Sequence, residues 1–258
     1  MEWYIILAVI GVGIVAGFIN TLAGSGSLLT LPLLMFLGLP ANIANGTNRI
    51  GVFFQGLVAS GSFKKQKVLD LKATKWMIIP SILGSIIGSV WAVNITNEIM
   101  EYFIAGLLIV MFFVILYNPE AWIKGQAGKV HEKTSIIQII IFFFIGLYGG
   151  FIQAGVGFFL LAGLVLGAGY DLVKANAIKV FITMAFTLFA LIVFMINKQV
   201  DYLLGFILAI GSIIGAYIGA HVAVSWGPKF VRIILLVAII GSALKLLGIF
   251  DLIIRLIE

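Results

Sequence analysis

The most regular feature of this chain is a series of long apolar runs separated by short polar stretches. Each run holds about 20 residues, which as an α-helix rising about 1.5 Å per residue matches a bilayer core about 30 Å thick. The pattern therefore predicts membrane-spanning helices. They are expected over residues 3–22, 43–63, 74–94, 98–117, 134–154, 175–196, 202–224 and 229–250.

Two shorter apolar runs, over residues 27–38 and 158–169, each follow a glycine-rich stretch. Each would extend only about 18 Å as a helix, which is too short to cross a bilayer alone. We expect them to be re-entrant segments or pieces of broken helices. A polar stretch over 118–133 separates the two groups of spans.

The two groups of spans repeat each other at a constant offset of 131 residues. Chance matches are expected among apolar residues in such a composition, but not among asparagine, aspartate and paired glycine at one gapless offset. The matched pairs include Gly24 with Gly155, Gly26 with Gly157, Asn45 with Asn176, Lys67 with Lys198, Asp70 with Asp201, and Gly84 with Gly215. The sequence predicts a first repeat over 1–120, a cytoplasmic linker over 121–133 and a second repeat over 134–258.

The expected fold is an all-α integral membrane protein of two homologous halves, each with four full spans and one short broken or re-entrant segment. If the short segments do not cross, there are eight spans and the halves are parallel. If both cross, there are ten segments and the halves are inverted. With the Lys64–Lys75 loop in the cytoplasm, the positive-inside rule does not separate the two. Segment length favours eight spans and parallel halves.

Composition agrees with a multi-pass protein of the cell membrane. The chain has 258 residues, of which 62% are hydrophobic and 10% charged, and its mean hydropathy is +1.22. A soluble domain usually has about 25% charged residues. The net charge of +6 is explained by lysines that hold loops against anionic lipid headgroups, and we expect no nucleic-acid partner.

Motifs for enzymatic chemistry are missing from the sequence. It has no cysteine, no His/Cys cluster, no Walker loop and no Gly-x-Ser-x-Gly elbow, which argues against thiolate, metal, nucleotide and serine-hydrolase chemistry. We therefore expect no enzyme, no cofactor and no metal. Repeated halves are instead a common architecture of secondary transporters, whose substrate site lies where the halves meet.

The first candidate site is the pair of glycine-rich breaks. Glycine allows a helix to unwind, and unwound backbone persists in a bilayer only where protein or a wet cavity supplies its hydrogen bonds. A helix that begins after such a break directs free N–H groups and its positive end toward it, which suits an anion. The alternative is that these glycines only permit tight packing. The candidate residues are Asn20, Thr21, Gly24, Ser25, Gly26, Gln153, Gly155 and Gly157.

The second candidate is the start of the third segment in each half. The residues are Asn45, Thr47, Asn48 and Arg49 in the first half, and Asn176 and Lys179 in the second. Asparagine is a common helix N-cap and a basic residue near a span end can reach the headgroups, so a structural role is the alternative. A cation in the first turn of a helix opposes the helix dipole. The pattern therefore predicts anion attraction or binding, with Arg49 suited to bidentate contact with an oxyanion.

Other polar residues within spans carry weaker signals. Gln55 lies six residues after Arg49, so it faces a different direction on the same helix. His221 lies near a predicted end, where it fits an interfacial side chain as well as a proton carrier. The acidic residues fall near ends or in loops, so no buried carboxylate pair announces proton-coupled cation transport.

Glycines spaced four residues apart, Gly84/Gly88 and Gly211/Gly215/Gly219, predict close helix approach. We expect them to pack the two halves together. A homo-oligomer interface is the alternative.

The residues at the two breaks resemble a known family. The stretch GFINTLAGSGSLLTLPLLMFLGLPANIANGTN and its looser repeat GFIQAGVGFFLLAGLVLGAGYDLVKANAIK are similar to the TauE/SafE family of sulfite and organosulfonate transporters. Gly24, Gly26, Pro32 and the Asn45–Thr47 start match the family pattern. The second half departs from it, with Gly163 in place of the proline and Ala177-Ile178 in place of Gly-Thr. The resemblance covers nearly the whole chain.

What the resemblance implies is secondary transport of small sulfur-containing oxyanions, with export as the expected direction. Its partners would be a small anionic substrate, the lipid bilayer and a coupling ion, either H⁺ or Na⁺. Alternatives from other classes are a membrane assembly or scaffold protein without transport, and a transporter or channel for a different solute. Because the first half carries the fuller polar set, we expect it to supply most contacts of a single site.

Overall fold

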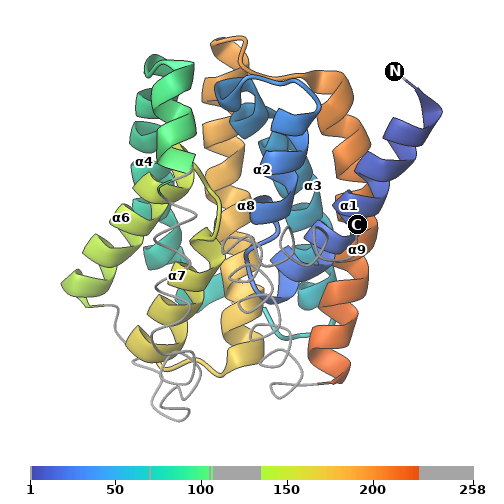
Figure 1. Ribbon diagram of the computed structural model, residues 1–258. Helices are drawn as coiled ribbons and strands as arrows, with labels where there is room; N and C mark the ends of the chain where they lie inside the picture. Colours follow the sequence, from blue (N-terminus) through green and yellow to red (C-terminus); the bar gives the residue numbers. More distant parts are fainter. Residues whose placement is uncertain (1, 70, 105, 107–134, 227–258) are drawn as a thin grey trace, which may run out of the picture.

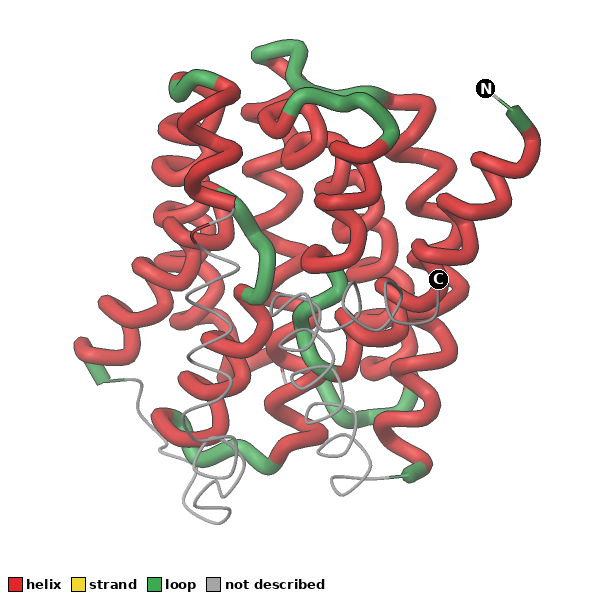
Figure 2. Tube along the Cα trace, viewed as in Figure 1, coloured by secondary structure: helices red, strands yellow, loops and turns green. Residues whose placement is uncertain are grey.

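The computed structural model describes residues 2–69, 71–104, 106 and 135–226, and every regular element within them is helical (Figures 1 and 2). The elements are α1 Trp3–Leu22, α2 Ser27–Phe36, α3 Ala41–Lys65, α4 Leu71–Asn94, α6 Ile136–Phe151, α7 Val156–Ala162, the π-helical turn η1 Gly163–Gly167, α8 Leu172–Ile196 and α9 Tyr202–Ser225. The predicted span 229–250, the linker 121–133 and most of the span 98–117 lie outside the described residues.

Four of these helices are long and apolar enough to cross a membrane, judged by length and composition: α1, α4 from Thr74, α8 and α9. Helix α3 has 25 residues, but Asn45, Asn48, Arg49 and Gln55 lower its hydropathy. Large apolar side chains on the outside of the bundle, such as Leu83 on α4 and Ile210 on α9, are more than half exposed, as expected for surfaces that face lipid. The described residues therefore have the all-α membrane architecture that the apolar runs predict.

Glycines bring the helices of the bundle into backbone contact. A Cβ atom added to Gly84 would lie 2.1 Å from the Phe143 carbonyl oxygen, and one added to Gly215 would lie 1.9 Å from that of Ile14. Helix α4 thus packs against α6, and α9 against α1, with α3 and α8 between the two pairs (Figure 1). This confirms the prediction that the spaced glycines pack segments of the two halves together.

Helix bounds and backbone angles follow the offset of 131 residues. Both bounds of α3 and α8 differ by 131, and so do both bounds of α4 and α9. Lys67 and Lys198, which correspond at this offset, have positive φ angles of 58° and 57°. The glycine pairs Gly24 and Gly155, and Gly38 and Gly169, also have positive φ.

Corresponding helices run in opposite directions. Asn42, at the start of α3, donates to the Ile95 carbonyl just beyond the end of α4, at 3.0 Å. Gln199, just beyond the end of α8, donates to the Val93 carbonyl at 3.0 Å. Helices α3 and α9 therefore begin at the end of the bundle where α4 and α8 finish, as Figure 1 shows.

The parallel orientation favoured by segment length is therefore wrong. Length counted α1 as a crossing and α2 as none, but α2 leads back to the end of the bundle where α1 began, and α3 starts there (Figure 1). Helix α6 and the α7–η1 segment do the same from the opposite end. Helix length measures how far a segment can reach, and it does not report where a break turns the chain around.

Candidate functional site

The two glycine-rich breaks cross each other inside the bundle. A Cβ atom added to Gly24 would lie 2.3 Å from the Gly157 Cα, and one added to Gly157 would lie 2.2 Å from the Gly24 Cα. Gly24 also has a φ angle of +79°, which side-chain-bearing residues rarely adopt. Only glycine at both positions allows the two unwound backbones to touch.

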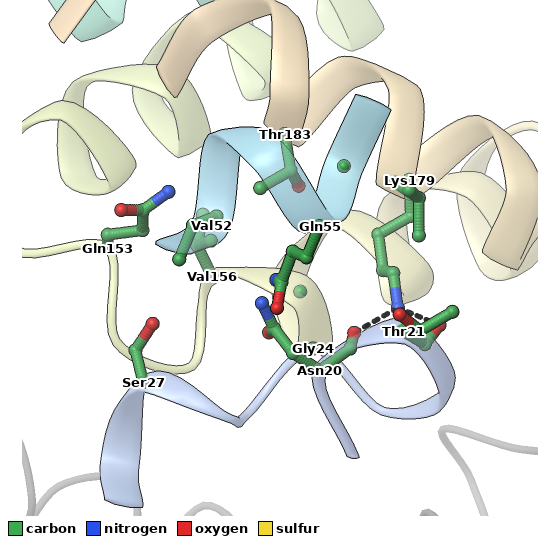
Figure 3. A pocket seen from close by; sticks show the side chains of 13 residues that line it. Asn20, Thr21, Gly24, Ser27, Val52, Gln55, Gln153, Val156, Lys179 and Thr183 are labelled. Carbon is green, nitrogen blue, oxygen red and sulfur yellow. Dashed lines mark hydrogen bonds between the residues drawn. The ribbon is translucent and has the colours of Figure 1, made fainter. Parts of the chain in front are cut away.

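A small cavity lies beside this crossing (Figure 3). Its space open to the centre of a water-sized sphere is about 10 Å³, which is room for about one water. The lining comes from both breaks, from α3 and from α8. The lining residues are Asn20, Thr21, Gly24, Ser27, Val52, Gln55, Gly56, Gln153, Val156, Gly157, Lys179, Val180 and Thr183.

Lys179 is the charged side chain among the described residues that line the cavity. Its Nζ atom donates to the carbonyl oxygens of Asn20 at 3.0 Å and Thr21 at 2.9 Å, as drawn in Figure 3. These carbonyls belong to the last turn of α1, where a helix lacks internal donors and its dipole favours a cation. Lys179 thus holds the end of α1 while it borders the cavity.

Arg49 does the same work at the other break but does not line the cavity. Its Nη1 donates to the Gly149 carbonyl at 3.1 Å and its Nη2 to the Gly150 carbonyl at 2.6 Å, both in the last turn of α6. The guanidinium also lies 4.6 Å from the Phe194 ring centroid, a cation–π distance. Each cation therefore stabilises the end of a broken helix from the opposite half.

The helix starts place these cations differently from the sequence-based expectation. Arg49 is well inside α3, which begins at Ala41, and Lys179 is well inside α8, which begins at Leu172. Neither lies in a first turn, so neither opposes the dipole of its own helix there. The sequence could not show that each serves the C-terminal end of another helix.

Two glutamines bring buried polar groups to the cavity wall. Gln153 is 2% exposed, and its Oε1 has no hydrogen-bond partner, while its Nε2 donates to Thr187 Oγ1. Gln55 is 6% exposed, and within the described part of the chain no hydrogen bond holds its side-chain amide. Figure 3 shows Gln55 extending from α3 toward Asn20 and Gly24. Buried polar groups without partners are costly unless a ligand or water satisfies them.

Several predicted residues have partners within the fold instead of positions on the cavity. Asn45 donates to the Phe151 carbonyl at 2.7 Å, and Thr47 Oγ1 accepts from the Asp201 backbone N–H at 2.8 Å. Asn48 donates to Ser27 Oγ at 3.0 Å and accepts from Thr30, which ties α3 to α2. These bonds hold helices around the breaks.

The other predicted residues off the cavity lie close to it in sequence. Ser25, Gly26 and Gly155 belong to the breaks but do not line the cavity. Asn176 is fully buried, and neither of its side-chain amide atoms has a hydrogen-bond partner. The structure thus brings Asn20, Thr21, Gly24, Gln153, Gly157 and Lys179 together at the cavity and leaves the remaining predicted residues outside its wall.

Sequence reasoning missed part of the wall. The residues not singled out as site residues are Ser27, Val52, Gln55, Gly56, Val156, Val180 and Thr183. One signal could have found two of them, because Val52 and Thr183 correspond at the offset of 131 residues. Gln55 was noticed as a polar residue in an apolar helix and set aside because it does not share the face of Arg49. The cavity lies on that other face.

Comparison with known proteins gives the chain its family. Residues 9–246 match the family model described as sulfite exporter TauE/SafE. The chain belongs to this family. The TauE/SafE match takes in both breaks and every cavity residue, and it agrees with the resemblance seen at the breaks. No solved structure matches the chain significantly.

Characterised names among the similar proteins point to membrane transport. A "probable membrane transporter protein" of Haemophilus influenzae is 27% identical over 221 residues, covering 86% of each chain. A protein of Sinorhizobium with the same description is 26% identical over 238 residues, covering 91% of this chain and 89% of its own. The "probable membrane transporter protein YfcA" of Escherichia coli strain K12 is 27% identical over 234 residues, covering 90% and 86%. The family and these names support a membrane transporter.

Proposed function

We propose that this protein is a secondary transporter of small sulfur-containing oxyanions, such as sulfite or organosulfonates, across the cell membrane, with export as its direction. The observation that carries the proposal is Lys179, a buried cation on a cavity formed where two broken helices cross. The described lining holds no acidic residue. A cavity with one cation and several neutral polar groups is suited to a small anion.

The neutral polar groups of the cavity give the anion its further contacts. Gln55 and Gln153 have amide atoms free of internal partners, and Thr183 and Ser27 add hydroxyl groups on the same wall. An oxyanion offers several acceptor oxygens, so amide N–H and hydroxyl donors around one ammonium can satisfy them together. Asn20 and Thr21 complete this set at the end of α1.

Residues off the cavity have a supporting role in this proposal. Arg49 and Asn45 hold the end of α6, Asn48 holds the start of α2, and Thr47 holds the start of α9. Ser25, Gly26 and Gly155 shape the breaks, and Asn176 lies behind the wall. Such groups keep the binding groups in place, as a supporting shell does around a functional site.

Alternating access is the proposed mechanism. The cavity holds about one water, so a sulfite-sized anion requires the two halves to move apart around the crossing of the breaks. Two inverted halves in a multi-pass membrane protein are suited to this motion, since rocking one against the other exposes a central site first to one side and then to the other. The equal bounds of α3 with α8 and of α4 with α9 at one offset support this two-half layout.

Counterflow in proteoliposomes tests the proposal. Vesicles that contain the purified protein and are loaded with unlabelled sulfite should accumulate external labelled sulfite, and vesicles without protein should not. Parallel assays with an alkanesulfonate, with sulfate and with a neutral sulfone define the substrate class. Counterflow of the neutral sulfone alone would contradict an anion site, and absence of counterflow for every solute would favour a protein without transport activity.

A further inference from the structure

Lys179 has one hydrogen-bonding position more than its protein partners use. A protonated lysine amine carries three N–H donors, and a neutral one carries two donors and a lone pair. Two donors are used by the Asn20 and Thr21 carbonyls. The third position is left for the cavity that Lys179 borders (Figure 3).

No other titratable group shares this position. Among the described residues packed around α8, Arg49 of α3 donates to α6 carbonyls, Tyr148 of α6 donates to the Ala154 carbonyl, and His221 of α9 bonds the Tyr217 carbonyl. The remaining charged or titratable groups on neighbouring elements lie near helix ends or in loops: Glu2, Tyr4, Lys64, Lys65, Lys75, Tyr170, Asp171, Lys174, Tyr202, and Tyr217. None of these lines the cavity.

We propose that Lys179 is the proton-binding site that couples transport, and that it takes up its third proton together with the anion. This inference rests on the proposed anion transport. With the amine neutral, both of its N–H groups remain on the α1 carbonyls and the cavity holds no charge. When an anion enters, a proton from water occupies the lone pair, and the new N–H donates to the anion.

The cycle balances in charge and in protons. One proton and one monovalent anion enter the cavity from the same side, and both leave to water on the other side when the amine loses its proton. The two carbonyl bonds survive in both states, so the end of α1 stays held throughout. A sodium ion is a poorer coupling ion for this site, because the described lining has no carboxylate to bind it and Lys179 would repel it while charged.

Isothermal titration calorimetry of the purified full chain tests the coupling. Methanesulfonate serves as the probe because a sulfonate stays ionised through the neutral and alkaline range, so protons taken up on binding belong to the protein. Titrations in two buffers of different ionisation enthalpy give the number of protons bound. The wild-type protein should take up close to one proton per anion in alkaline solution and none in acid, where the amine is already charged.

Two variants separate proton coupling from simple charge attraction. Lys179→Arg keeps the positive charge but cannot lose its proton, so it should bind methanesulfonate without proton uptake at any pH. Lys174→Arg makes the same exchange on the same helix at an exposed lysine, and it should behave as the wild type. Sulfite is the second probe, and the difference between wild type and Lys179→Arg cancels the protonation of sulfite itself.

The outcomes distinguish this inference from the proposed function. Binding of either anion without proton uptake by the wild type, or with uptake retained in Lys179→Arg, would overturn the coupling role and leave anion transport standing. Absence of binding to the wild type would overturn both. If Lys179→Arg does not fold, the wild-type Kd decides alone: it should rise about tenfold per pH unit in alkaline solution, and a constant Kd would overturn the inference.

Discussion

The two buried cations, Arg49 and Lys179, do the same structural work in different chemical surroundings. Each comes from one half and holds the last carbonyls of a broken helix in the other half. Only Lys179 also borders the cavity. Two halves with matching helices can therefore keep one support symmetric and make the other part of a binding site.

Side-chain chemistry explains this division. A guanidinium presents its donors in a rigid planar fork, which suits several carbonyls at fixed positions, and it stays charged at any physiological pH. An ammonium is compact, has three donors on one atom and can lose a proton. Arginine is therefore suited to a permanent support, and lysine to a support that also responds to a ligand. The cation of the cavity comes from the second half, although the first half carries the fuller polar set.

The largest effect is expected for Arg49→Ala. It removes donors from the Gly149 and Gly150 carbonyls and should cost about 3–5 kcal/mol of folding free energy, since each hydrogen bond to a charged group contributes about 1.5–3 kcal/mol. Thermal unfolding of the detergent-purified protein measures the loss. Lys64→Ala, at an exposed lysine of the same helix, is the matched control. An Arg49→Ala protein as stable as the control would show that the end of α6 needs no support.

A smaller loss is expected for Gly157→Ala. The added Cβ would lie 2.2 Å from the Gly24 Cα, and because both neighbours are backbone the crossing must move apart. Overpacking of this kind costs about 1–3 kcal/mol, and counterflow should be lost because the cavity wall shifts. Gly61→Ala places a Cβ where no atom lies within 4 Å and should leave stability and counterflow unchanged. Equal behaviour of the two variants would contradict the crossing of the breaks.

The smallest effect is expected for Gln55→Leu, and its two readouts should differ. Removing a buried amide without internal partners should leave thermal stability unchanged or raise it. Loss of one neutral hydrogen bond to the anion should weaken binding by about 1 kcal/mol, or about fivefold. Calorimetric titration with sulfite and a thermal scan of the same sample give both values. A loss of stability without a change in affinity would mean that Gln55 belongs to the packing and not to the site.

Much of the helical layout is predictable from sequence because apolar runs determine it locally. The predicted span 3–22 has the bounds of α1, and 202–224 differs from α9 by one residue. The direction of the halves was not predictable from length, because the turn at Gly24 and the partners of α2 decide it. Positive φ at glycine is permitted by sequence, but the direction in which the chain then leaves depends on tertiary packing.

The candidate site was predictable in part for the same reason. Paired glycines beside polar residues marked both breaks, and six of the predicted residues do line the cavity. Gln55 and Thr183 were not found, because a single polar residue on an apolar helix gives no sign of which face meets a cavity. The partners of Arg49 lie 100 or more positions away in the chain, so only the folded structure reveals that its donors are already engaged.

Equilibrium binding of labelled sulfite to purified protein tests the central claim, that Lys179 binds the transported anion where the breaks cross. Lys179→Met keeps the length of the side chain and removes its charge. Lys174→Met makes the same change at an exposed lysine of the same helix. The account predicts that Lys179→Met weakens sulfite binding by more than about tenfold, as expected for loss of a charge-assisted hydrogen bond, while Lys174→Met binds as the wild type does. A folded Lys179→Met protein with wild-type affinity for sulfite would contradict it.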